Sequence, residues 1–145
     1  RVASGTFLAM AGLNRLNVTD IGANAIDTRD MLPAVGQGAI GIERRSADEA
    51  TANFLQPIND LETEKQLEAE RAFLGTLDGS CQTPIAGLAI IEDSALTLRG
   101  EVLRPDGSEK ISGIRIGSIA DGVDMGRDLA TYLLSQAGPD FFSWR

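Results

Sequence analysis

Residues 96–108 read LTLRGEVLRPDGS, and this stretch decides the fold of the chain. From Leu96 to Val102, apolar or small residues alternate with polar ones, which is the period of a strand with one buried face. Residues 105–108 then bring together proline, aspartate, glycine and serine, the residue types that favour turns. A strand that ends in such a turn predicts a second strand directly after it.

Helical and strand-like patterns surround this stretch on both sides. Asn59 or Asp60 can cap the helix before the strands, Gly79 ends it, and Gly138-Pro139 ends the helix after them. This order predicts a small three-stranded antiparallel sheet covered by helices on one face. The expected elements are a helix over 61–77, strands over 85–91, 96–103 and 110–116, and a helix from 119 or 120 to 136.

The residues before Asn59-Asp60, the best candidate for a domain boundary, have a different pattern. Ser46 followed by Glu49 has the spacing of a capping box. The expected elements are a helix over 3–16, an irregular stretch over 20–30, an extended one over 31–35, a strand over 38–43 and a helix from 46 to about 58. They resemble the remains of an α/β unit whose other strands are missing. The predicted fold class is therefore α/β, with an α+β C-terminal domain.

Composition excludes several classes of function. The formal net charge of −8 argues against nucleic acid and anionic membranes as partners, because both bind basic surfaces. No run approaches the roughly 18 apolar residues of a membrane helix. With one Cys and no His, the chain has no Cys–His or Ser–His–Asp system, and we expect no metal site. A lone Cys suits a reducing compartment, and we expect the cytoplasm.

The chain starts at Arg1, and its first predicted helix has no visible cap. We therefore expect this sequence to be a piece of a longer protein.

Cys81 lies in the polar turn 79–84, between a helix and a strand, where functional residues often occur. The partial negative charge at a helix C-terminus does not favour a reactive thiolate, so a protease-type nucleophile is not expected. Two interpretations remain. The side chain is a small buried hydrophobe, or it is a permanent thioether anchor that forms once and does not turn over.

Residues 36–41 spell G-x-G-x-x-G, yet a strand and not a helix is predicted after them, which argues against a dinucleotide site. The alternative is a glycine-rich bend where the backbone passes close to another element or to a ligand, with the Gln37 amide available to it. Arg15, at the end of the first helix, is either a solvated cation or a clamp for carboxylates.

Other side chains have structural interpretations. Arg44-Arg45 is read as a solvated edge. The aromatic residues near the C-terminus are expected to pack as a terminal staple. The acidic residues of the 61–77 helix are read as its wet face. The aromatic residues are Phe141, Phe142 and Trp144. The acidic residues are Glu62, Glu64, Glu68 and Glu70.

Several segments, in their order and spacing, together resemble the porphobilinogen deaminase (hydroxymethylbilane synthase) family. The loop around Cys81 is moderately specific by itself, and the combination is highly specific. The segments are residues 8–16, 32–39 with 41–43, 69–74, 79–85 and the turn 105–108.

The resemblance implies a three-domain enzyme, usually monomeric, of which this chain holds part. Residues 1–33 would close the second domain, 34–60 would cross back to complete the first, and 61–145 would form the third, cofactor-carrying domain. Such transferases of haem and chlorophyll biosynthesis join four porphobilinogen molecules head to tail into hydroxymethylbilane and release ammonia. The primer is a dipyrromethane held by a thioether to the loop cysteine, here Cys81. A plant protein of this family would be in a plastid.

The resemblance also assigns roles to single residues. Arg15 matches an arginine that binds the acetate and propionate groups of substrate and growing polypyrrole chain. Gln37, with Gly36 and Gly38, matches a hinge segment that lines the cofactor cleft, and Gly12 matches a position where a helix approaches the pyrroles.

No residue of this chain matches the catalytic aspartate, which in the family lies upstream of the equivalent of Arg1. We therefore assign no catalytic residue, name the missing N-terminal half as a partner, and expect the chain to be inactive alone. The alternative is a non-catalytic regulatory module that binds a small ligand, in which Cys81 is incidental.

Overall fold

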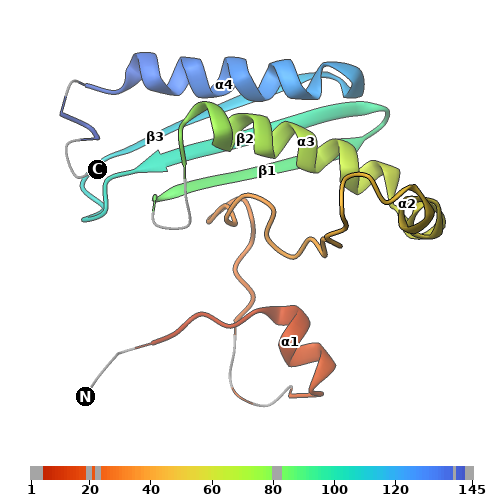
Figure 1. Ribbon diagram of the computed structural model, residues 1–145. Helices are drawn as coiled ribbons and strands as arrows, with labels where there is room; N and C mark the ends of the chain where they lie inside the picture. Colours follow the sequence, from red (N-terminus) through yellow and green to blue (C-terminus); the bar gives the residue numbers. More distant parts are fainter. Residues whose placement is uncertain (1–4, 19–20, 22–23, 80–82, 139, 143–145) are drawn as a thin grey trace. The chain divides into compact units, whose positions relative to one another are not determined.

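Three antiparallel strands in the order β1-β2-β3 form the sheet that residues 96–108 predicted (Figure 1). In the computed structural model these are β1 (Ile85–Glu92), β2 (Ala95–Leu103) and β3 (Lys110–Ser118), each slightly longer than expected. Gly87 pairs with Gly100, and Gly100 pairs with Gly113, so three glycines lie side by side across the sheet.

The structure describes residues 5–18, 21, 24–79, 83–138 and 140–142. The chain divides into two compact units, Arg1–Met31 and Leu32–Arg145. The division into parts 1–33, 34–60 and 61–145 stays a prediction. None of the described helices combines the length and apolar character needed to cross a bilayer.

Two tight turns connect the strands. Asp93 and Ser94, at φ 50° and 63°, make the two-residue turn between β1 and β2. In the predicted turn between β2 and β3, Gly107 has φ +73° and the Asp106 carboxylate accepts a hydrogen bond from the Ser108 amide at 3.0 Å. The predicted turn chemistry is therefore confirmed, because a positive φ at Gly107 is accessible to glycine at little cost.

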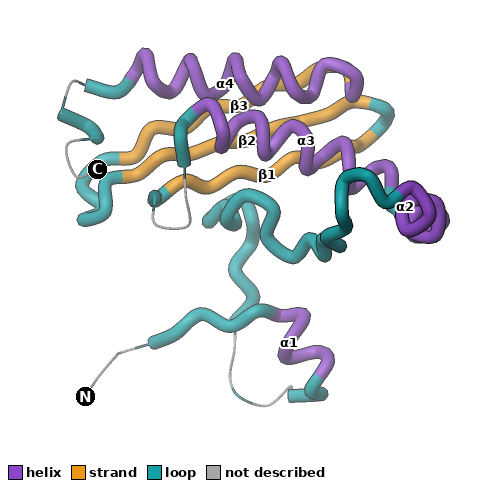
Figure 2. The backbone as a smooth tube through the Cα atoms, viewed as in Figure 1, coloured by secondary structure: helices purple, strands orange, loops and turns teal. Residues whose placement is uncertain are grey.

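Helices α3 (Leu61–Thr76) and α4 (Gly122–Gln136) cover one face of this sheet (Figure 2). A 3₁₀ turn, η2 (Ile119–Asp121), leads into α4. The side chains between helices and sheet form one apolar core, and burying it is the main favourable contribution to folding. Its fully buried larger members are Phe73, Leu77, Leu96, Leu98, Val102, Leu129, Leu133 and Phe141.

The ends of α3 are determined locally. Of the two predicted caps, Asp60 is the one used, and its carboxylate accepts a hydrogen bond from the Thr63 amide at 2.8 Å. The helix was expected to end at Gly79, but the residue in the left-handed conformation is Asp78, one position earlier, at φ 52°. The amides of Asp78 and Gly79 donate to the carbonyls of Gly75 and Leu74, so the last turn closes as a Schellman motif.

The cap at Asp60 predicts an acid-sensitive contribution to stability. The hydrogen bond from the Thr63 amide lowers the pKa of Asp60 below its ordinary value. The contribution is therefore fully present above the unfolded pKa of about 4 and is lost as pH falls through the lower folded value. Asp60→Asn keeps an acceptor but not the charge, so urea midpoints between about pH 6 and pH 2 should fall less steeply with acid than in the parent chain. Identical acid slopes would contradict this.

Two predictions for the residues before Asn59 were wrong, one in the length of a helix and one in the existence of a strand. Helix α1 spans only Met10–Arg15, because it has no side-chain cap and no buried residue, and a short helix without tertiary packing is marginal. The strand expected over 38–43 does not form. Ile40 is 94% exposed, and no strand in the described residues pairs with this segment. An unpaired strand leaves its backbone groups to water.

The helix expected from 46 to about 58 is present as α2 (Glu49–Leu55) followed by the 3₁₀ turn η1 (Gln56–Ile58). The prediction of Ser46 as its N-cap was wrong. The cap is Asp48, whose carboxylate accepts a hydrogen bond from the Thr51 amide at 3.0 Å. The Asp48 carboxylate also pairs with Arg45 at 3.0 Å, which Ser46 could not do.

The C-terminal aromatic staple is confirmed for its two described members. Phe141 is fully buried, and the Phe142 ring meets it edge-on with centroids 4.9 Å apart. The guanidinium of Arg104 lies 5.1 Å from the centroid of Phe141 and donates to the Asp140 carbonyl at 3.0 Å. Trp144, the third predicted member, lies outside the described residues.

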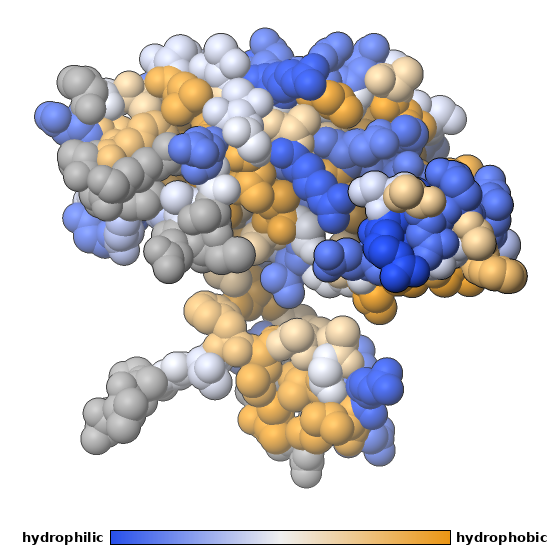
Figure 3. Space-filling model, viewed as in Figure 1, coloured by the Kyte–Doolittle hydropathy of each residue, from blue (hydrophilic) through white to orange (hydrophobic). Residues whose placement is uncertain are grey.

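The first unit exposes an unusual amount of apolar surface. Hydrophobic side chains dominate the face of this unit that Figure 3 shows, and the irregular stretch predicted over 20–30 has no helix or strand among its described residues. An exposed surface of this kind is typical of a contact area. Its exposed large side chains are Phe7, Leu8, Met10, Leu16, Ile21, Ile26 and Met31.

Candidate functional site

The glycine-rich segment forms the bend that its composition predicted. It consists of two overlapping turns over residues 34–39, here called the double bend. Gly36 and Gly38 have φ +70° and +84°, values that a residue with a side chain rarely adopts. The backbone amide of Gln37 donates to the Ala34 carbonyl at 3.0 Å, and the backbone amide of Ala39 donates to the Gly36 carbonyl at 3.2 Å. Gln37 belongs to both of these overlapping turns and is exposed, so its side-chain amide is accessible to a ligand.

The double bend lies against the edge of the sheet. The Pro33 carbonyl accepts a hydrogen bond from the Gly87 amide in β1 at 3.0 Å. The carboxylate of Glu70, in α3, accepts from the Gly36 amide at 2.7 Å and from the Ala89 amide at 2.8 Å. The backbone therefore does pass close to another element, which was one of the two predicted reasons for the glycines.

Glu70 is the functional candidate that the sequence interpretation missed. It was placed on the wet face of its helix, but it is only 5% exposed, so that prediction was wrong. A signal existed, because Glu70 lies three and seven residues before the buried Phe73 and Leu77, on the same helix face. Glu64 and Glu68 are half-buried, and Glu62 is exposed as predicted.

Cys81 lies outside the described residues, and so its predicted role stays a prediction. The chain on both sides of its loop is well anchored. Gly79 closes α3, and a side chain there would collide with Leu74 and Ile85. On the other side, the Pro84 carbonyl accepts from the Leu103 amide at 2.9 Å as β1 begins. The loop is therefore followed by the strand whose edge amides, at Gly87 and Ala89, donate to the Pro33 carbonyl and to the Glu70 carboxylate.

Gly12 and Arg15 both lie on α1 in the first unit. Gly12 is exposed, and a side chain there would meet nothing within 4 Å, so the helix surface is open at this position. Arg15 is in the last turn of α1 and is exposed. Both are accessible to a ligand, and their roles as contacts to it stay predictions.

The basic pair Arg44-Arg45 is exposed to solvent, as predicted, although the strand expected before it does not form. Arg45 is 87% exposed and pairs with Asp48, whose pKa is lowered by the Thr51 amide first and by Arg45 second. Arg44 donates to the Arg45 and Ser46 carbonyls at 3.0 Å. These contacts hold the residues at the start of α2. They also occupy both guanidinium groups, which therefore do not point together toward one ligand site.

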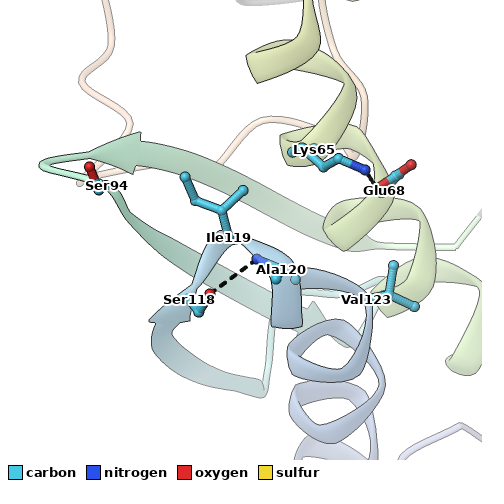
Figure 4. Close-up of a pocket in the computed structure, with 8 residues that line it drawn as sticks. Lys65, Glu68, Ser94, Ser118, Ile119, Ala120 and Val123 are labelled. Carbon is cyan, nitrogen blue, oxygen red and sulfur yellow. Dashed lines mark hydrogen bonds and ion pairs between the residues drawn. The ribbon is translucent and has the colours of Figure 1, made fainter.

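A hollow of about 610 Å³ lies at the end of β1 away from the Cys81 loop (Figure 4). Among its polar groups, Lys65 pairs with Glu68 at 2.7 Å and Ser118 accepts from the Ala120 amide at 3.2 Å. None of the predicted site residues that the structure describes lines it. Within the part of the chain that the structure describes, no three acidic, His or Cys side chains gather to hold a metal ion.

Comparison with known proteins places similarity along almost the whole chain. Residues 1–53 match the family described as porphobilinogen deaminase, dipyromethane cofactor binding domain, and residues 65–135 match the porphobilinogen deaminase C-terminal domain.

Individual relatives are similar over nearly all of these residues. A porphobilinogen deaminase of Paracoccus denitrificans is 55% identical over 143 residues, 99% of this chain and 46% of the relative. The chloroplastic enzyme of Pisum sativum is 48% identical, over 98% of this chain and 39% of its own length. One from Nitrobacter hamburgensis is 45% identical, over 97% and 45%. The chain thus spans less than half the length of these relatives.

Proposed function

The chain belongs to the porphobilinogen deaminase family, and from this membership we propose that it is part of a hydroxymethylbilane synthase. Such a transferase joins four porphobilinogen molecules head to tail. Each step forms a carbon–carbon bond between pyrrole units and breaks a carbon–nitrogen bond, with ammonia as the leaving group. The observation that carries the proposal is the 55% identity over 143 residues to a relative of that name.

The residues of the double bend fit a dipyrromethane cofactor. Gly36 and Gly38 have no side chains, and the space beside Gly38 is open, so a planar pyrrole ring can approach the backbone there. The exposed Gln37 amide offers two donors and an acceptor to ring nitrogens or carboxylates. We propose that Cys81 holds the cofactor by a thioether and that Gly12 approaches the pyrroles. When bound, the dipyrromethane supplies the terminal pyrrole carbon that the first substrate joins.

The carboxylates of substrate and product need cations. Every pyrrole unit carries an acetate and a propionate, and a guanidinium binds such groups with two parallel hydrogen bonds. Arg15, exposed at the end of α1, is the residue proposed for this role. The reaction also needs a carboxylate to stabilise the positive charge that develops on the pyrroles. Both carboxylate oxygens of Glu70 already accept backbone hydrogen bonds, so we do not assign Glu70 to this role. No other residue is proposed as the catalytic acid, and we propose that this chain is inactive alone.

The exposed apolar surface of the first unit supports the proposed domain division. Residues 1–33 would complete a second domain, 34–60 a first, and 61–145 the third. The missing N-terminal half would then cover side chains such as Phe7 and Leu16, which are 75% and 73% exposed. We further propose a monomer in the cytoplasm, or in a plastid if the source is a plant. A lone thiol in an acidic chain supports a reducing compartment without nucleic acid or membrane partners.

Intact mass measurement of the full-length gene product tests this function. We expect the purified protein to carry a covalent addition of two pyrrole units, and Cys81→Ser to lack both the addition and porphobilinogen consumption. The matched control is Ser80→Ala in the same loop, which should retain both. An unmodified chain from a complete and active preparation would contradict the proposal and favour the regulatory module.

A further inference from the structure

Glu70 is a buried charge that the proposed chemistry does not use. It is 5% exposed, and within the described residues no lysine or arginine forms an ion pair with it. An ionised carboxylate is costly to bury unless hydrogen bonds replace its water. Two hydrogen bonds replace that water here, and their donors indicate what the carboxylate does.

Both partners are backbone amides, and they belong to segments far apart in the sequence. Glu70 Oε2 accepts from Gly36, 34 residues upstream, and Glu70 Oε1 accepts from Ala89, 19 residues downstream. Hydrogen bonds to an ionised acceptor are shorter and stronger than neutral ones, and these measure 2.7 and 2.8 Å. One side chain of α3 thus joins the double bend to β1.

Neither amide has a backbone acceptor in the sheet. Strand β1 is an edge strand, and the amide of Ala89 is on its unpaired side. The neighbouring edge amide, of Gly87, is taken by the Pro33 carbonyl at 3.0 Å. The chain therefore runs beside β1 for one hydrogen bond, turns away at the double bend, and leaves the next edge position to the Glu70 carboxylate.

We propose that Glu70 is a positioning residue that sets the place of Gly36, Gln37 and Gly38 relative to the cofactor-carrying domain. This inference rests on the proposed function. Glu70 touches neither cofactor nor substrate in this scheme. It acts through the bend, because Gly36 and Gln37 both belong to the two overlapping turns, and holding the Gly36 amide fixes the turns that present Gln37.

The chemistry of the two acceptors explains why a carboxylate is needed. A glutamine at position 70 has one acceptor oxygen, and its NH₂ group would face one of two amides that are themselves donors. One buried N–H would then lose its partner, and the bend would detach more easily from β1. An aspartate is one methylene shorter and reaches only one of the two amides without rearrangement.

Glu70→Gln in the full-length protein tests the inference. We expect the cofactor addition to remain in the intact mass, because Cys81 is untouched, while kcat falls about ten- to a hundredfold as Gln37 loses its place. Glu70→Asp should fall between Glu70→Gln and the parent. The matched control is Glu68→Gln, two residues away on α3, whose half-exposed carboxylate pairs with Lys65. It should keep the parent's kcat.

Amide hydrogen exchange gives a second measurement that does not depend on activity. The Gly36 and Ala89 amides should exchange about tenfold or more faster in Glu70→Gln than in Glu68→Gln, while amides within β2 stay protected. Unchanged exchange at both positions would overturn the inference, as would an unchanged kcat. If the parent carries no dipyrromethane, the proposed function fails, and the exchange result still decides whether Glu70 holds the bend.

Discussion

Phe73→Ala is expected to destabilise the 145-residue chain by about 3–5 kcal/mol. The ring is fully buried between α3 and the sheet. It occupies space that two paired glycines leave free, since a side chain at Gly87 would approach the ring to 3.3 Å and one at Gly100 to 2.5 Å. Neither glycine has a side chain that could move into the cavity left by alanine, so the sheet cannot help to refill it.

Urea unfolding followed by circular dichroism measures this loss. The matched control is Phe54→Ala in α2, where the ring is 82% exposed and the same truncation should change the free energy of unfolding by no more than about 0.5 kcal/mol. Similar shifts of the urea midpoint in the two variants would mean that Phe73 is not central to the core. Since domains are stable by only about 5–15 kcal/mol, Phe73→Ala is expected to leave a substantial unfolded population at elevated temperature.

Gly126→Ala is expected to destabilise the chain, although alanine is the better helix former by about 1 kcal/mol. Helix α4 lies so close to α3 at this point that an added Cβ would be 2.9 Å from the Phe73 amide nitrogen and in collision with the Ala69 carbonyl oxygen. Backbone atoms cannot rotate away as a side chain can. The helices must separate, and overpacking of this kind costs about 1–3 kcal/mol.

Gly75→Ala provides the opposite expectation with the same chemical change. Gly75 is also within a helix, near the end of α3, but a side chain there would meet nothing within 4 Å. This substitution should raise the free energy of unfolding by about 0.5–1 kcal/mol, because it restricts the unfolded chain without strain in the folded one. A stabilising effect of both substitutions would refute the close approach of α3 and α4 at Gly126.

The sequence by itself determined the elements whose signals lie within a few residues of one another. The alternation before the turn at 105–108 predicted β2, and the similar runs on both sides predicted β1 and β3. Asp60 was one of two predicted caps because its carboxylate needs only to reach the amide three residues later. The glycines of the double bend were recognised because a positive φ is a property of single residues.

Only the tertiary structure decided the features that depend on partners far along the chain. The segment 38–43 alternates like a strand, but no strand among the described residues pairs with it, and it stays irregular. Glu70 is acidic and was read as solvent-facing, yet amides 34 residues before it and 19 after it surround the carboxylate. The physical reason is the same in both cases. The free energy of a strand or of a buried charge depends on which groups satisfy its hydrogen bonds, and folding brings those groups from elsewhere in the chain.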